Sequence, residues 1–290
     1  MKPPWLKKKL SLNALQPMQR KLRGLNLHTV CEEARCPNIS ECFGRGIATI
    51  MIMGDICTRA CKFCAVATGR PKPPDPDEPF KTAQWARELG LRHLVITSVD
   101  RDDLPDLGAA HFAETVRQIR SKNQGMIIEV LTPDFQGKGD LISKVAETEP
   151  EIYNHNLETV KRLTPHVRSA SKYARSLSVL SFVKKNFPHL TVKSGLMLGL
   201  GETEEEVVGA MKDLVNSGCD LLTLGQYLQP TPKHLPVVEY IHPDRFEAFK
   251  KIGMELGFGA VFAGPFVRSS YMAENFFQMT KSPDALQTGL

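Results

Sequence analysis

The sequence predicts an α/β fold in the form of a partial (β/α)6 barrel of the TIM type. Short apolar runs alternate with helical segments about six times along the chain. This alternation is typical of βαβ units with a parallel sheet. A doubly wound sheet also satisfies the pattern, but this number of repeats in 290 residues favours a full or partial barrel. In both architectures the chemistry belongs at the carboxyl ends of the strands.

The strands are predicted where short apolar runs lie between turn signals. The first, 48–54, ends at a glycine and leads directly into a group of cysteines. The other predicted strands are 93–99, 126–131, 152–156, 191–198 and 221–227, and a further apolar run covers 260–267. Polar residues follow several of these strands, so we expect them to line one active site.

The helices are predicted between the strands. Thr203 and Glu206 form a potential capping box at the start of one of them, and Gly218 ends it. The predicted helices are 82–90, 109–122, 140–147, 169–186, 203–217 and 243–256. Each strand is thus followed by a helix, which is what a barrel requires.

The composition is ordinary, with 42% hydrophobic and 24% charged residues. No apolar run approaches the roughly 18 residues of a membrane span. The basic start, 1–10, is followed by no apolar signal core, so we expect a cytoplasmic protein rather than a secreted one. The net charge of +5 suits an acidic protein partner or an anionic small molecule as well as a nucleic acid, but no nucleic-acid-binding motif favours the last of these.

Six of the seven cysteines fall within residues 31–64. In a chain that is not secreted, clustered cysteines are expected to bind metal rather than to form disulfides. They form two triplets, Cys31-x4-Cys36-x5-Cys42 and Cys57-x3-Cys61-x2-Cys64. Each triplet is one ligand short of a closed tetrahedral zinc site or a fully cysteine-ligated cluster. The pattern therefore predicts two metal centres, each with one position for another ligand.

The second triplet favours an iron–sulfur cluster over zinc. Three thiolates on one tight loop can hold three irons of a [4Fe-4S] cluster and leave the fourth iron for a substrate. A zinc knuckle would want a fourth cysteine or histidine nearby, and residues 65–92 contain neither. With Phe63 before its last cysteine, the loop resembles the signature of radical S-adenosylmethionine enzymes. The resemblance implies that S-adenosylmethionine chelates the open iron and is cleaved to a 5′-deoxyadenosyl radical.

The first triplet, in the sequence CEEARCPNISEC, resembles the C-x4-C-x5-C element of lipoyl synthases. The resemblance covers essentially the whole chain, and the first triplet and the Arg-Ser-Ser-Tyr element are its specific parts. The Arg-Ser-Ser-Tyr element is Arg268–Tyr271, and the other elements of the resemblance are Lys2–Leu6, Thr97–Leu104 and Gly199–Thr203. The family resemblance implies an auxiliary [4Fe-4S] cluster on Cys31, Cys36 and Cys42. It also implies a serine as the fourth ligand, either Ser269 or Ser270, and we favour Ser270.

The contacts to S-adenosylmethionine are expected at strand ends. The segment 153–159 is similar to one in biotin synthase, which implies that Asn156 and Glu158 bind the ribose hydroxyls. Ser98 is placed to contact the methionyl amine. Arg175 could bind the methionyl carboxylate, because a guanidinium matches a carboxylate in a bidentate fork. No protein acid or base is assigned.

The resemblance implies sulfur insertion at C6 and C8 of a protein-bound octanoyl-lysine, with the auxiliary cluster as sulfur donor. The implied partners are octanoylated lipoyl carrier domains, either the glycine cleavage H protein or the E2 type of 2-oxoacid dehydrogenases. Reduced flavodoxin or ferredoxin is the implied electron donor, and neither a nucleic acid nor a membrane is expected as a partner. One alternative is another sulfur-inserting or methylthiolating radical enzyme. The other is a non-catalytic iron–sulfur electron-transfer protein.

We expect one structural domain with three parts. An N-terminal extension, 1–47, carries the first triplet and has little periodicity, so its metal should contribute much of its stability. The barrel covers 48–258 and carries the second triplet. A C-terminal extension, 259–290, carries the Arg-Ser-Ser-Tyr element. The two extensions are expected to cover the open mouth of the barrel.

Overall fold

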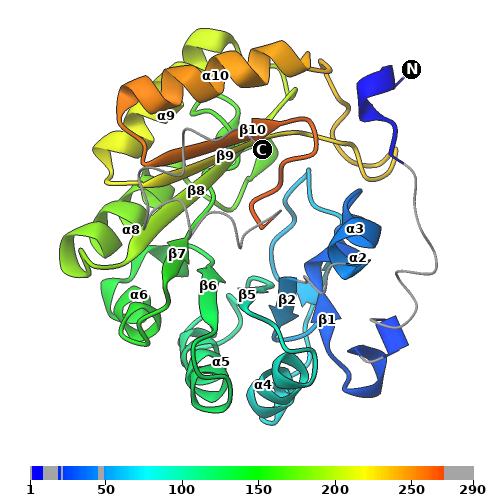
Figure 1. Cartoon of the computed structure of the whole chain (residues 1–290), viewed down its shortest axis with the longest axis vertical. Helices are drawn as coiled ribbons and strands as arrows, with labels where there is room; N and C mark the ends of the chain where they lie inside the picture. The colour runs from blue at the N-terminus through cyan, green and yellow to red at the C-terminus, as the bar shows by residue number, and fades with distance from the viewer. Residues whose placement is uncertain (1, 9–18, 21, 45–48, 271–290) are drawn as a thin grey trace.

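The computed structural model describes residues 2–8, 19–20, 22–44 and 49–270. Within these ranges, eight strands form one curved sheet in the order β1-β2-β5-β6-β7-β8-β9-β10. Every pair from β2 to β10 is parallel, whereas the short β1 is antiparallel to β2. The larger helices lie along the outer side of the sheet (Figure 1). The predicted class, a partial barrel of βα units, is therefore confirmed.

The parallel strands coincide closely with the predicted ones. The run at 260–267 also contains a strand, which pairs in parallel with its neighbour and makes the sheet one strand longer than a (β/α)6 unit. The strands are β2 (Thr49–Ile52), β5 (His93–Ser98), β6 (Ile127–Leu131), β7 (Ile152–Asn154), β8 (Thr191–Leu198), β9 (Leu221–Gln226) and β10 (Ala260–Gly264). The proposed division into three parts remains a prediction.

The helices also follow the prediction, with two differences in where they begin. Helix α4 (Glu78–Glu88) begins before the predicted 82, because Pro79 lies in its first turn, where a missing N–H is tolerated. The predicted 169–186 helix begins only at Tyr173 as α8 (Tyr173–Asn186). The other large helices are α5 (Ala109–Lys122), α6 (Gly139–Ala146), α9 (Glu204–Asn216) and α10 (Pro243–Leu256), and a short α7 (Thr164–Val167) precedes α8. The capping box of α9 is confirmed.

Short elements position the two cysteine triplets. Strand β1 (His28–Thr29) adds to the edge of β2 and continues into α2 (Val30–Glu33), and α3 (Ile39–Gly44) follows. Strand β3 (Ile56–Cys57) contains the first cysteine of the second triplet and pairs in parallel with β4 (Ala67–Thr68), which follows the last one. The remaining short elements are the 3-10 turns η1 (Pro4–Leu6) and η2 (Phe135–Gly137).

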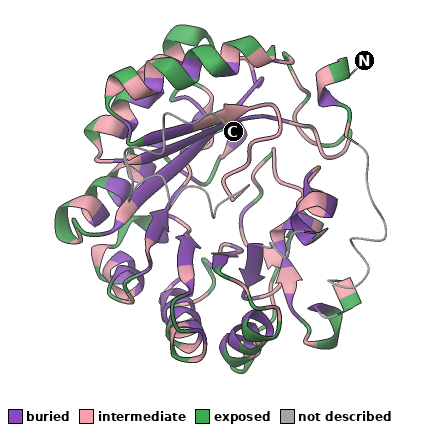
Figure 2. Ribbon diagram, viewed as in Figure 1, coloured by how far each residue is buried: buried purple, intermediate pink, exposed green. Residues whose placement is uncertain are grey.

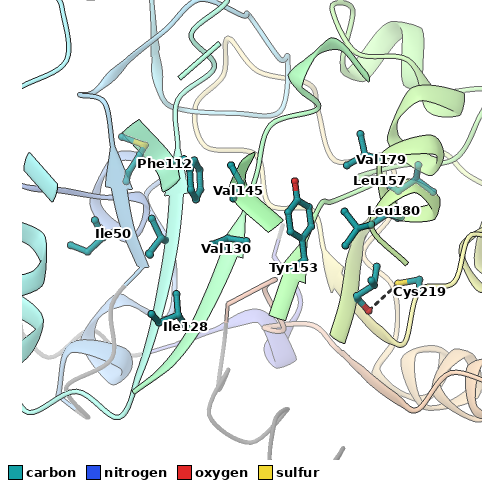
Figure 3. Close-up of a cluster of buried hydrophobic side chains, with 14 of the residues drawn as sticks. Ile50, Phe112, Ile128, Val130, Val145, Tyr153, Leu157, Val179, Leu180 and Cys219 are labelled. Carbon is teal, nitrogen blue, oxygen red and sulfur yellow. Dashed lines mark hydrogen bonds between the residues drawn. The ribbon is translucent and has the colours of Figure 1, made fainter. Parts of the chain in front are cut away.

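The main apolar core lies between the sheet and its helices. Figure 2 shows buried residues along the strands and on the inward sides of the helices, with exposed residues on the outer side. Phe112 of α5 and Val130 of β6 are two of the side chains that meet there (Figure 3). Cys219 is buried in this core, as predicted, and its thiol donates to the carbonyl of Leu221. No helix in the described part of the chain combines the length and apolarity needed to span a membrane.

Candidate active site

A cavity of ≈ 520 Å³ is lined by residues at the carboxyl ends of the strands. It brings together both cysteine triplets and the described part of the Arg-Ser-Ser-Tyr element, which are far apart in the sequence. The predicted site residues on its wall are Cys31, Cys36, Cys42, Cys57, Cys61, Cys64, Ser98, Asn156, Glu158, Ser269 and Ser270. Groups held by the two triplets would therefore lie in the same cavity.

The loop that carries the second triplet is held by Arg59, which lies inside it. The Arg59 side chain is only 5% exposed and donates to both carboxylate oxygens of Asp102, at 2.7 and 2.8 Å. It also donates to Asp134 at 2.9 Å, although that carboxylate is completely buried. Burial alone would raise the pKa of Asp134, but the bonds and the charge of Arg59 outweigh it and lower that pKa to about 2. The loop is thus fastened to the ends of two strands.

The thiols of the second triplet need a cation to become thiolates. Burial raises the pKa of Cys61 to about 12 and that of Cys64 to about 11. Burial and the Asp100 carboxylate raise the pKa of Cys57 as well. The backbone N–H groups of Arg59 and Asp100 donate to the Cys57 sulfur at 3.4 and 3.3 Å. Because these donors favour a negatively charged sulfur, they suit a metal-bound thiolate.

The first triplet lies on two short helices, α2 and α3, and on the connection between them, which contains Cys36. Thr29 caps α2 by accepting a hydrogen bond from the backbone N–H of Glu32, so Cys31 lies in the capped first turn of this helix. Burial and the neighbouring Cys36 thiol raise the pKa of Cys31. Asn38, between the second and third cysteines, donates to the carbonyl of Phe266 at 2.7 Å. The triplet segment and the segment after β10 are therefore in direct contact.

The donor sets fit [4Fe-4S] clusters. All seven cysteines lie within the described residues, and none forms a disulfide. No three His, Cys, Asp or Glu side chains in the described ranges are grouped so as to hold a single metal ion. In a cluster each thiolate binds a different iron, so its ligands stand further apart than those of one zinc. The three thiols of each triplet are the donor type that the irons of such clusters prefer.

The residues predicted to bind S-adenosylmethionine lie on the wall next to the second triplet. The Ser98 hydroxyl is buried and has no hydrogen-bond partner among the described atoms, which suits a group awaiting a ligand. Asn156 donates to Glu158 at 3.0 Å. Burial raises the pKa of Glu158, and the nearby Arg168 opposes that effect. An amide and a carboxylate side by side can bind a vicinal diol.

Arg175, the predicted carboxylate ligand, and Arg168, which was not predicted, differ in their position relative to the cavity. Arg175 does not appear on the cavity wall, and its guanidinium lies 3.2 Å from Asp134. Arg168 does line the cavity, and it donates to the carbonyls of Asn156 and Leu157 at 3.0 and 3.2 Å. The sequence prediction did not include Arg168, because this residue directly follows α7, a short helix that was not predicted. It missed the role of Arg59 because its acidic partners follow distant strands.

Comparison with known proteins agrees with this arrangement. Residues 51–214 match the model of the radical SAM superfamily, and residues 1–36 match the N-terminal domain of lipoyl synthase. Among solved structures, methylornithine synthase is 13% identical, with a TM-score of 0.55 over 77% of this chain and 74% of that one. The FeFe-hydrogenase maturase from Carboxydothermus hydrogenoformans is 14% identical, with a TM-score of 0.52 over 80% and 65%. These likenesses concern the fold.

The barrel and the C-x3-C-x2-C loop define a radical S-adenosylmethionine enzyme, which uses this cosubstrate and [4Fe-4S] chemistry. The lipoyl synthase of Thermus thermophilus is 54% identical over 95% of this chain and 86% of its own length. The mitochondrial lipoyl synthase of Branchiostoma floridae is 52% identical over 95% and 75%. The chain belongs to the lipoyl synthase family. It is thus a sulfur-inserting enzyme that acts on lipoyl carrier proteins.

Proposed function

We propose that the chain holds two [4Fe-4S] clusters in the cavity that both cysteine triplets line, and that it inserts sulfur at C6 and C8 of a carrier-bound octanoyl-lysine. The observation that carries the proposal is the position of the six cysteines of the two triplets on the wall of that cavity. When bound, one cluster supplies the electron that cleaves S-adenosylmethionine, and the other supplies sulfur. The residues of the chain bind these groups, orient them and keep the reacting carbon between them.

Cys57, Cys61 and Cys64 are the proposed ligands of the radical-generating cluster. Ser98 and the pair Asn156–Glu158 are the proposed contacts for the amine and the ribose of S-adenosylmethionine. Arg175 was the predicted partner of the carboxylate. We add Arg168 as a second candidate, because it lines the cavity and its charge acts on Cys61.

Cys31, Cys36 and Cys42 are the proposed ligands of the auxiliary cluster, with Ser270 as the fourth. Ser269 also lines the cavity, but its hydroxyl donates to Asn156 and accepts from Asn154. An alkoxide ligand would have to give up the proton that Asn156 accepts. These bonds favour Ser270 over Ser269.

We propose that the carrier is the glycine cleavage H protein or an E2-type lipoyl domain, and that reduced flavodoxin or ferredoxin supplies electrons in the cytoplasm. Two exposed cations, Lys2 and Arg35, lie on the cavity wall and suit an acidic carrier surface. Lys8 bonds to Asn38 at 2.7 Å and to Glu41 at 2.6 Å, so it is already engaged within the protein.

The proposal is tested by iron analysis and anaerobic turnover. Two clusters require about eight irons per chain. With reductant, S-adenosylmethionine and an octanoyl-lysyl peptide, the enzyme should form 5′-deoxyadenosine and insert two sulfurs into the peptide. A Cys31→Ser, Cys36→Ser, Cys42→Ser variant should keep about four irons and still cleave S-adenosylmethionine without sulfur insertion. Sulfur insertion by that variant would contradict the proposed sulfur source.

A further inference from the structure

A chain of hydrogen-bonded polar side chains, buried at its inner end and half-buried at its outer end, runs from the barrel interior to the proposed ribose site. It begins at Glu129 of β6, which accepts from the ammonium of Lys193 at 2.9 and 3.0 Å. Both side chains are completely buried. Asn154 also donates to Glu129, at 2.8 Å, and is itself completely buried. The chain continues through Ser269, so the segment after β10 is part of it.

The direction of each hydrogen bond is fixed by the Glu129 carboxylate. Because a carboxylate can only accept, Asn154 must present its NH2 group, which also donates to the Ser269 hydroxyl at 2.7 Å. Ser269 then accepts with its oxygen and gives its proton to the Asn156 carbonyl oxygen at 3.0 Å. Asn156 is left with its NH2 group toward Glu158, at 3.0 Å.

The neighbourhood leaves Asn156 little other freedom. A Cβ on Gly195 would lie 3.0 Å from the Asn156 carbonyl oxygen and 2.6 Å from the Thr223 hydroxyl, so only glycine lets the amide lie where it does. The segment with Ser269 is held in the same way, because a Cβ on Gly225 would lie 2.1 Å from the Val267 carbonyl oxygen. Ser269 thus joins two tightly fitted parts.

We infer that Ser269 is a positioning residue that orients Asn156 for S-adenosylmethionine and makes binding of this cosubstrate depend on the seating of the Val267–Ser270 segment. The inference rests on the proposed roles of Asn156 and Glu158. Since coupling between two sites is reciprocal, S-adenosylmethionine should in turn stabilise the segment that carries the proposed cluster ligand Ser270. No direct contact between S-adenosylmethionine and Ser269 is required.

The test compares Ser269→Ala with Ser269→Thr, which keeps the hydroxyl, and with Ser178→Ala, which removes an exposed hydroxyl from α8. Iron content is measured on the reconstituted enzymes by chemical analysis, and the Kd of S-adenosylmethionine is measured by equilibrium dialysis. Ser269→Ala should raise the Kd about tenfold, or about 1.4 kcal/mol. It should keep about eight irons per chain. The other two variants should stay within about threefold of the wild-type Kd.

Hydrogen exchange gives a second readout. S-adenosylmethionine should slow exchange at Val267–Ser270 in the wild type and in Ser269→Thr, but not in Ser269→Ala. An unchanged Kd in Ser269→Ala would overturn the inference, whether or not iron is lost. Loss of about four irons with wild-type affinity would identify Ser269 as a cluster ligand instead. Asn156→Ala separates the positioning role of Ser269 from the proposed ribose site. An unchanged Kd in Asn156→Ala would contradict the ribose site itself.

Discussion

Arg59 shows how a residue between two cluster ligands can act through partners outside the loop. Its guanidinium meets Asp102, Asp134 and, at 3.3 Å, Asp100. These carboxylates follow β5 and β6, so one side chain ties the loop to two strands. A lysine could not reproduce this, because it lacks the planar fork that contacts several carboxylates at once.

Replacement of Arg59 by alanine should lower the free energy of unfolding by about 3 kcal/mol, because Asp134 would remain buried without its main counter-charge. Chemical denaturation under anaerobic conditions measures the change. The matched control is Arg117→Ala, where an arginine whose side chain is 59% exposed forms an ion pair with Glu114, and the change should be below about 0.5 kcal/mol. Equal effects of the two substitutions would contradict the role given to Arg59.

Glu129 makes stability depend on pH. Burial opposes its charge, but Lys193 and His93 lower its pKa below the ordinary 4.5. A lowered carboxyl pKa gives stability that is complete above pH 4.5 and is lost as the pH falls through the folded-state value. The urea midpoint should therefore decrease below about pH 4.5. Glu129→Gln should weaken this decrease, in addition to its general destabilisation, and an unaltered pH profile would exclude Glu129 as a source.

At the level of elements, the segment after β10 is seated by β9. Gly225 faces the Val267 carbonyl so closely that any side chain would have to displace it. Asn38 holds the same segment from the other side through Phe266. The contact between Asn38 and the segment after β10 therefore depends on the absence of a side chain at Gly225.

Gly225→Ala should displace Val267–Ser270 and lower iron from about eight to about four per chain, because the proposed ligand Ser270 moves with the segment. Iron analysis and the spectrum of the remaining cluster measure the change. Gly209→Ala, the same substitution in α9, meets nothing within 4 Å and should add about 0.5–1 kcal/mol of stability. Retention of both clusters in Gly225→Ala would show that the segment does not hold the auxiliary one.

The elements that the sequence predicted best are those with local signals. Helix α5 has its predicted bounds, and α9 has the predicted cap. Strand β1 has only two residues and owes its existence to pairing with β2, so no periodicity could reveal it. Asn154 and Ser269 are 115 positions apart, and the polar chain between them follows only from the fold. The six cysteines could be predicted as ligands because their spacing is itself a local signal.

For the whole molecule, the carrier must bring its octanoyl chain to a cavity whose rim carries two exposed cations, Lys2 and Arg35. Lys2→Glu should raise the KM for the carrier about fivefold at low salt and less at high salt, because this attraction is screened. kcat should be unchanged, since Lys2 is outside the proposed cluster and cosubstrate sites. Lys212→Glu on the outer face of α9 makes the same charge change as a control. Equal effects of the two would exclude docking at this rim.

The pairing of β1 with β2 sets the geometry between the two reactions. Strand β1 leads to the first triplet and β2 leads to the second, and they are joined by the pairs His28–Met51 and Thr29–Ile50. A shift of one residue would move one triplet past the other by about 3.3 Å and reverse the faces of β1. The register of these two strands therefore sets the spacing of the two triplets. It thereby also sets the distance between the two proposed clusters.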